Sequence, residues 1–446
     1  MKTRAKRLVV RPSTSSSTWA WQLLLAVGLL AAPARAQSDS ISSQAPIHYD
    51  TSKSDDSVAR LQKQIDAGRI KLSREDGHGY LESVLKWLKV PVSSQTLVFS
   101  KTSFQRDLIS PSRPRALYFN DNTYIGFVQG GEVLEAVAVD NQLGPVFYTL
   151  NQKQADKPRF IRQTDNCLQC HESNMTQNVP GLLVRSVYPE ASGIPLFSAG
   201  TFRTTDASPF KERYGGWYVT GTHGSQRHMG NQILRDGDDP EGLDLGRGAN
   251  VKDLSGRLNV SPYLASTSDV VALMVLTHQT QIHNLLTNAN YQTRLALRDQ
   301  EVMNRALNEK PDHVFESTQQ RIKGACEPLV RAMLFCDAAP LTDRVTGSST
   351  FAVDFPGAGP RDPAGRSLRD FDLQKRLFKY PCSFLIYSES FSSLPAPAKQ
   401  WVYQRLWDIL SGKETSKDFD GLSADDRRAI REILIATLKG LPGYWK

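Results

Sequence analysis

The chain has 446 residues, of which 40% are hydrophobic and 22% are charged, the composition of an ordinary globular protein. Its 30 glycines and 24 prolines are too few for a collagen-like or wholly disordered chain, and its five cysteines are too few for a fold built on disulfides. The formal net charge is +8, and its meaning depends on where the positive side chains lie.

Residues 1–36 have the three parts of a secretory signal peptide. Five basic side chains stand within the first eleven residues, an apolar run extends from Leu23 to Ala32, and an A-x-A sequence ends the segment at Ala36. An uncleaved membrane anchor is the alternative, but the apolar run is short for a bilayer and polar residues follow it at once. The segment predicts export to the bacterial periplasm, with cleavage after Ala36.

Cleavage at this position removes most of the positive charge. The segment carries six positive and no negative side chains, so the net charge falls from +8 to +2. A nearly balanced chain shows no electrostatic footprint of nucleic-acid binding, and we expect no nucleic-acid partner. No second long apolar run follows residue 32, so we also expect no transmembrane span after cleavage.

The N-terminal half combines short helices with strands. Val58, Leu61 and Ile65 recur at helical spacing and predict a first helix within residues 55–70; a second is predicted over residues 79–90. Next come short runs rich in β-branched and aromatic residues, separated by Asp-Asn, Gly-Gly and Gly-Pro. These runs predict an antiparallel meander over residues 115–151. Further strands are expected at 182–189 and 215–222, and a glycine-rich loop at 221–261.

The C-terminal half has a helical pattern. Ser266, with Asp269 three residues later, predicts a capped helix start, and no proline interrupts the stretch 270–308. Further helices are predicted over 319–336, 399–410 and 424–441. The chain therefore predicts an α+β fold. Its expected divisions are the signal peptide 1–36, an N-terminal helical segment 37–114, a β-containing region 115–261 and an α-helical region 262–446.

The pentapeptide from Cys167 to His171, Cys-Leu-Gln-Cys-His, is the most specific motif. Cys167 and Cys170 are spaced to add to the two vinyl groups of one haem, and His171 is placed to coordinate its iron. A redox dithiol does not need the histidine, and half of a zinc site needs a second Cys/His pair that the sequence lacks. The single motif predicts one covalently bound haem c, with its iron, inside the β-containing region.

This motif in an exported chain resembles the c-type cytochromes. The longer stretches around it, residues 164–189 and 212–231, further resemble a group of uncharacterised bacterial exported proteins described as containing a cytochrome c domain. The first resemblance implies a haem protein and covers little beyond the motif. The second covers most of the mature chain and implies no particular activity. In a small cytochrome c the motif stands near the start of an all-helical domain, whereas here it follows a β meander.

The second axial ligand of the iron decides between functions, because a saturated iron transfers electrons and an open iron binds ligands. His223, His228 and Met229 lie in a glycine-rich loop that could place a side chain over a haem, although a solvated turn is as plausible a reading. His278 lies on the long predicted helix, where an interior histidine is the simpler interpretation. Met175 is discounted, because four residues from His171 are too few to reach the opposite haem face.

Other side chains have weaker assignments. Arg213 and Arg227 are candidates for pairing with haem propionates, because a guanidinium matches a carboxylate; solvated arginines are the default reading. One disulfide is expected among three cysteines, with its pairing left open: Cys326, Cys336 and Cys382.

Three functions remain open at this level. The first is periplasmic electron transfer with a redox partner protein, and it requires least beyond the motif. The second is a haem enzyme of peroxidase or oxygenase type with an open distal site, which the length of the chain favours. The third is a haem-based gas or redox sensor. The sequence leaves the substrate, the reduction potential and the oligomeric state undetermined.

Overall fold

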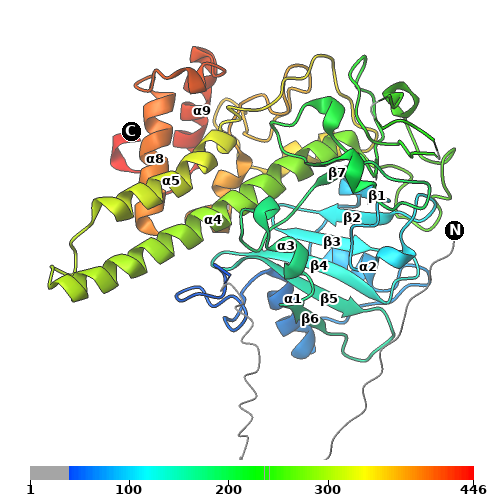
Figure 1. The fold of residues 1–446 in the computed structure, drawn as a ribbon, viewed down its shortest axis with the longest axis horizontal. Helices are drawn as coiled ribbons and strands as arrows, with labels where there is room; N and C mark the ends of the chain where they lie inside the picture. The colour runs from blue at the N-terminus through cyan, green and yellow to red at the C-terminus, as the bar shows by residue number, and fades with distance from the viewer. Residues whose placement is uncertain (1–39, 236, 241, 446) are drawn as a thin grey trace, which may run out of the picture. The chain divides into compact units, whose positions relative to one another are not determined.

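The computed structural model describes residues 40–445 except 236 and 241. The expected signal peptide and its cleavage site lie outside the described residues. The described residues belong to one compact unit. An antiparallel sheet occupies the N-terminal half and helices the C-terminal half, which confirms the α+β fold class (Figure 1). Within the described part, no helix combines the length and apolar character that crossing a membrane requires.

Seven strands in the described residues form the main sheet, in the order β6-β5-β4-β3-β2-β1-β9. The predicted meander is its centre, where neighbours in sequence pair through short turns. The edges are added by short strands, of which β1 and β6 were not predicted. The strands are β1 (Thr96–Val98), β2 (Arg115–Phe119), β3 (Thr123–Phe127), β4 (Val133–Asp140), β5 (Gly144–Asn151), β6 (Phe160–Gln163) and β9 (Trp217–Tyr218), with β7 (Arg185–Val187) and β8 (Thr201–Arg203) forming a separate pair.

The two faces of the main sheet contact different layers. Along β4, side chains alternate between fully and partly buried, because successive residues of a strand point to opposite faces. The fully buried face packs with α1 (Ser57–Asp66) and α2 (Leu81–Trp87), which are the two helices predicted from periodicity. The opposite face contacts α4 (Val270–Leu307), where Gln279 donates a hydrogen bond to the Tyr124 hydroxyl at 2.7 Å.

Helix α4 is the central element of the C-terminal half. Figure 1 shows it crossing beside the sheet and pairing with α5 (Glu316–Met333) in a hairpin that projects away from the strands. Leu286 of α4 belongs to the core of the helical half. Tyr291 and Leu295 belong to a second core, which includes the sheet face that packs with α1 and α2 and is called the core beneath the sheet. The boundaries expected from composition remain predictions. The other helices are α3 (Leu168–His171), α6 (Phe351–Asp354), α7 (Glu389–Ser392), α8 (Ala396–Leu410) and α9 (Ala424–Thr437).

The predicted helix start at Ser266 is wrong. Helix α4 begins after Asp269, whose carboxylate accepts hydrogen bonds from the amides of Val271 and Ala272 at 2.7 and 3.1 Å. The residues before it are held by the sheet instead, since the Ser268 hydroxyl donates to the Tyr218 carbonyl oxygen at 2.6 Å. The contact between Ser268 and Tyr218 therefore explains why the helix starts after Asp269 and not at Ser266.

The expected disulfide is also not found, because all five cysteines are free thiols. Cys326 lies within α5, which continues to Met333 before the chain reaches Cys336. Seven residues of helix separate Cys326 from the helix end by about 10 Å, and a disulfide needs Cα atoms within about 7 Å. Cys382 is fully buried in another segment.

Candidate haem-attachment site

The motif forms a single helical turn at the edge of the sheet. Helix α3 begins directly after Cys167, and the amides of Cys170 and His171 both donate to the Cys167 carbonyl oxygen, at 3.2 and 2.9 Å. Residues three apart on a helical turn lie on the same side, so the turn presents both sulfurs together. Cys167 is half-buried and Cys170 is exposed. Both thiols are thus reduced and close to the surface.

His171 is held in one orientation and one tautomer. Its Nδ1 lies 2.8 Å from the carbonyl oxygen of Gly181, and because a carbonyl only accepts, Nδ1 carries the proton. The ring also packs on Phe147 of β5, with ring centroids 4.8 Å apart. Burial lowers the pKa of this imidazole, which keeps it neutral. Its Nε2 therefore presents a lone pair, the state that a metal-ligating histidine requires.

Helix α4 fixes the loop that holds His171. The Asn284 side chain accepts from the Leu182 amide at 2.8 Å and donates to the Leu182 carbonyl oxygen at 2.7 Å. Gly181 passes so close that an added Cβ would lie 2.7 Å from Asn284 Oδ1 and 2.8 Å from the Cβ of Thr176. Neither Gly181 nor Asn284 was singled out from the sequence. Asn284 lies 102 residues from Leu182, so no local signal marked it.

An ion pair lies on the sheet face beside the motif. Arg115 of β2 pairs with Glu135 of β4, and both interact electrostatically with Cys167 and His171. Burial, together with the charge of Glu135, raises the pKa of the Cys167 thiol to about 11. Gly126 of β3 gives the guanidinium room, since a Cβ there would lie 2.5 Å from Arg115 Nη2. No local pattern marked this pair, because the two residues meet only when β2 and β4 both pair with β3.

Three large apolar side chains are exposed in segments near the motif: Phe104, Ile161 and Phe197, at 63%, 54% and 52%. Ser103 and Gln105, on either side of Phe104, donate hydrogen bonds to Glu135 at 3.1 and 3.0 Å.

Each of the other two side chains also has a link to the motif. Ile161 belongs to the strand that leads into it. Arg185, which interacts electrostatically with Cys170, lies 4.5 Å from the centre of the Phe197 ring. We call Phe104, Ile161 and Phe197 the apolar rim. Exposed apolar side chains near two thiols fit a site that a porphyrin ring would cover.

The candidate ligands of the glycine-rich loop are packed into the protein interior. In His223, Nδ1 donates to the Gln226 carbonyl oxygen at 2.9 Å and Nε2 accepts from the Asn250 amide at 3.1 Å. His228 is 1% exposed, and neither of its ring nitrogens has a hydrogen-bond partner. Its ring centroid lies 4.7 Å from that of His223.

Met229 lies behind β7 with respect to the motif. Its sulfur accepts from the Ser186 hydroxyl at 3.6 Å. Ser186 and Arg185 are successive residues of a strand, so their side chains point to opposite faces. Arg185 interacts with Cys170, which places Met229 on the other face of this strand.

His278 is engaged at both ring nitrogens. Its Nδ1 lies 2.6 Å from Asp206 Oδ2 and its Nε2 lies 2.8 Å from the Ser383 hydroxyl, while Phe335 stacks on the ring at 4.3 Å. These residue types match a hydrolase triad, but Ser383 is fully buried and also accepts from the Leu385 amide as a helix cap. The arrangement ties α4 to two distant segments and leaves neither nitrogen of His278 free for iron.

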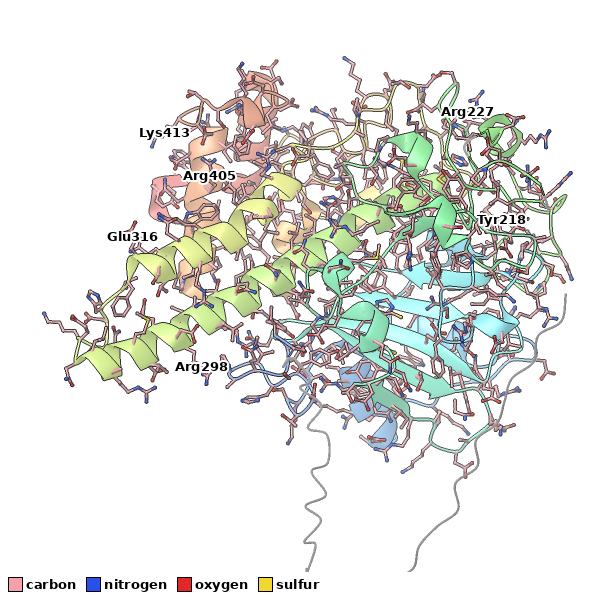
Figure 2. All side chains as sticks on the ribbon, in the orientation of Figure 1. Tyr218, Arg227, Arg298, Glu316, Arg405 and Lys413 are labelled. Carbon is pink, nitrogen blue, oxygen red and sulfur yellow. The ribbon has the colours of Figure 1, made fainter. Side chains whose placement is uncertain are left out.

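The two candidate propionate partners donate to backbone carbonyl oxygens. Arg213 is 4% exposed and donates to Ser208 and Asp206 at 2.9 and 2.8 Å. Arg227 donates to three carbonyl oxygens of its own loop, between residues 224 and 226, and Figure 2 shows it in the loop region above Tyr218. The described contacts therefore do not bring either arginine to the motif, whereas they bring Arg115 and Arg185.

Comparisons with known proteins found no match: no family model, no curated protein and no solved structure is similar to this chain. In the described part of the chain, no three histidine, cysteine, aspartate or glutamate side chains converge as a metal-binding group.

Proposed function

We propose that this protein is an exported monohaem c-type cytochrome-like protein that transfers electrons in the bacterial periplasm. Cys167 and Cys170 would hold the haem covalently, and His171 would be an axial ligand. The observation that carries this proposal is the Nδ1 contact of His171 with Gly181, which leaves Nε2 as a lone pair beside two free thiols. When bound, the haem iron would supply the one-electron redox chemistry.

The residues around the motif have defined tasks in this proposal. Phe147 and Gly181 orient the imidazole, so that coordination does not require ordering a free side chain. The apolar rim would exclude water from the porphyrin. A redox partner protein would exchange electrons at the exposed edge that carries Cys170. Export fits this chemistry, since covalent haem attachment of this kind takes place outside the cytoplasm.

A second candidate is a haem protein with an open sixth position, either a peroxidase- or oxygenase-type enzyme or a gas or redox sensor. The ring nitrogens of His223 and His278 are occupied, which favours this alternative. Met229 points away from the motif, and this also favours an open sixth position. Within the described residues, His228 is buried and neither of its ring nitrogens meets the geometry of a hydrogen bond, so it is the histidine of this loop that stays a candidate sixth ligand.

The first experiment measures covalent haem. The full-length chain is produced in a bacterium with cytochrome-maturation machinery, and the intact mass of the exported protein is measured. We expect a polypeptide that begins at Gln37 and carries one haem. Replacing both Cys167 and Cys170 by alanine removes the haem, whereas Cys326→Ala, the matched control thiol, keeps it. A bare polypeptide with both motif thiols still alkylatable contradicts the proposal.

Absorption spectroscopy separates the two candidate functions. A low-spin six-coordinate spectrum that carbon monoxide leaves unchanged supports electron transfer, and a high-spin spectrum with rapid carbon monoxide binding supports the open site. Alanine substitutions at His223, His228, Met229 and His278 then test each candidate ligand. Loss of the low-spin signal in one variant alone identifies the ligand.

A further inference from the structure

A cavity of about 170 Å³ lies in the helical half of the molecule. It is bounded by α4 and by four other segments, around residues 206–213, 334–341, 375–381 and 419–422. A cavity of about 150 Å³ can hold a benzene ring, so this one has room for a ligand of that size. Most of its wall is apolar, including Met274, Leu341, Leu377, Phe378 and Leu422.

Arg213 supplies an unusual charge to this wall. Its side chain is buried, yet no carboxylate of the described residues lies within 4 Å of its guanidinium. Asp206 also lines the cavity, but its carboxylate is turned to His278 at 2.6 Å. Burial raises the pKa of the neighbouring Tyr214 phenol, which keeps it uncharged. Arg213 donates to two carbonyl oxygens and lies 5.9 Å from the centre of the Phe210 ring, and a buried cation is normally paired with an anion.

A second positive charge stands at the edge of the cavity. Lys375 is exposed, and its ammonium forms no ion pair within the described residues. Arg376 lines the cavity too, but Asp426 pairs with it at 2.6 Å and so neutralises it. The cavity therefore combines apolar walls with two cations that form no ion pair within the described residues. Phe335 completes the wall at a φ of +55°, a backbone conformation that bulky residues rarely adopt outside functional sites.

We propose that this cavity binds a small organic anion, a carboxylate of about the size of benzoate. The carboxylate would pair with Arg213 and Lys375, and the apolar part would pack against Met274, Leu377 and Phe378. Arg213 was expected to pair with a haem propionate, and here it serves another carboxylate. The inference does not depend on the haem, because no residue of the motif lines the cavity.

Binding of benzoate and of benzamide to the full mature chain tests the proposal. The two probes have the same shape and differ in charge, so their comparison isolates the arginine and lysine. Ligand-detected NMR and calorimetry give both dissociation constants. We expect benzoate to bind at least about tenfold more tightly, the ratio that about 1.4 kcal/mol provides. Equal affinities, or no binding of benzoate at millimolar concentration, overturn the proposal.

Variants locate the site. Arg213→Gln is expected to abolish the preference for benzoate. Lys375→Gln is expected to weaken benzoate binding by up to about fivefold, because Lys375 is an exposed charge. Lys379→Gln, an exposed lysine of the same segment that does not line the cavity, is the matched control and keeps wild-type binding. If Arg213→Gln does not fold, benzoate binding is measured in Ala339→Leu instead. This substitution fills the cavity and keeps the charges of Arg213 and Lys375. Unchanged benzoate binding in Ala339→Leu excludes this cavity as the site.

Discussion

The carbonyl oxygen of Gly181 accepts the hydrogen bond that orients the His171 ring. An alanine at this position would bring its methyl group to 2.7 Å from Asn284 and 2.8 Å from Thr176, so the loop has to shift. We predict that Gly181→Ala lowers the free energy of unfolding of the haem-free chain by about 1–3 kcal/mol. Urea denaturation measures this change. Gly256→Ala is the control, because an added methyl group meets nothing within 4 Å there. Equal stability of both variants would show that the loop is not tightly packed.

Two buried histidines predict a loss of stability in acid. Desolvation by burial lowers the pKa of His228 to about 3 and that of His283 to about 4. Since an unfolded histidine has a pKa of about 6.5, the unfolded chain binds more protons between these values, and stability falls as the pH drops below about 6.5. Each such histidine contributes about 1.4 kcal/mol per pH unit within its window.

Denaturation of the haem-free chain at pH 7 and pH 4.5 measures this effect. His228→Gln is expected to lose less stability on acidification than the wild type, and His313→Gln, an exposed control, to lose as much as the wild type. The contribution of His228 is absent if the three pH profiles coincide.

Cys170 differs from the other four thiols in exposure. Burial raises the pKa of Cys326, Cys336 and Cys382 to about 12, whereas Cys170 is exposed. Because the thiolate is the reactive form, we predict that iodoacetamide labels Cys170 of the folded haem-free chain first. Mass mapping of labelled peptides over time checks the order. Earlier labelling of Cys382 would contradict the burial that the structure assigns to it.

At the scale of elements, one carboxylate fixes the start of α4. Asp269 caps the helix and also accepts from the amides of Ser348 and Ser349, both at 2.7 Å. The carboxylate is fully buried, so replacing it leaves several donors without partners. Helix α4 therefore depends on a loop that lies about eighty residues further along the chain.

We predict that Asp269→Ala lowers the free energy of unfolding by about 3 kcal/mol, the sum of a lost cap and unsatisfied buried amides. Ser423→Ala removes the cap of α9, which is exposed, and is expected to cost about 1 kcal/mol. Urea denaturation of both variants measures the difference. Equal losses would indicate that the amides of Ser348 and Ser349 find other partners.

For the whole molecule, α4 contributes to both hydrophobic cores, and this predicts that the chain unfolds in one cooperative transition. The buried residues of α4 belong to the core of the helical half and to the core beneath the sheet. A fragment of residues 262–446 would expose Tyr291 and Leu295 to water, together with the polar face that contacts the strands. We predict that this fragment does not unfold cooperatively, whereas the mature chain shows one transition. Circular dichroism during urea titration checks both, and a cooperative fragment would support the boundary near residue 262.

The sequence alone determined the features that depend on neighbouring residues. Hydrophobic spacing located α1 and α2, because periodic burial is a property of a single element. Runs of β-branched and aromatic residues between turn residues located the central meander. The pentapeptide at Cys167 indicated haem chemistry, because the spacing of the thiols and the histidine is itself the signal.

Only the tertiary structure decided which distant groups meet. It packed Asn284 against the loop that contains Gly181 and holds His171. It paired Arg115 with Glu135 beside the motif. It gave both ring nitrogens of His278 a hydrogen-bond partner. It also placed Arg213 at a cavity. The physical reason is that burial and hydrogen-bond partners arise from packing between segments a hundred or more residues apart, and no local pattern records that packing.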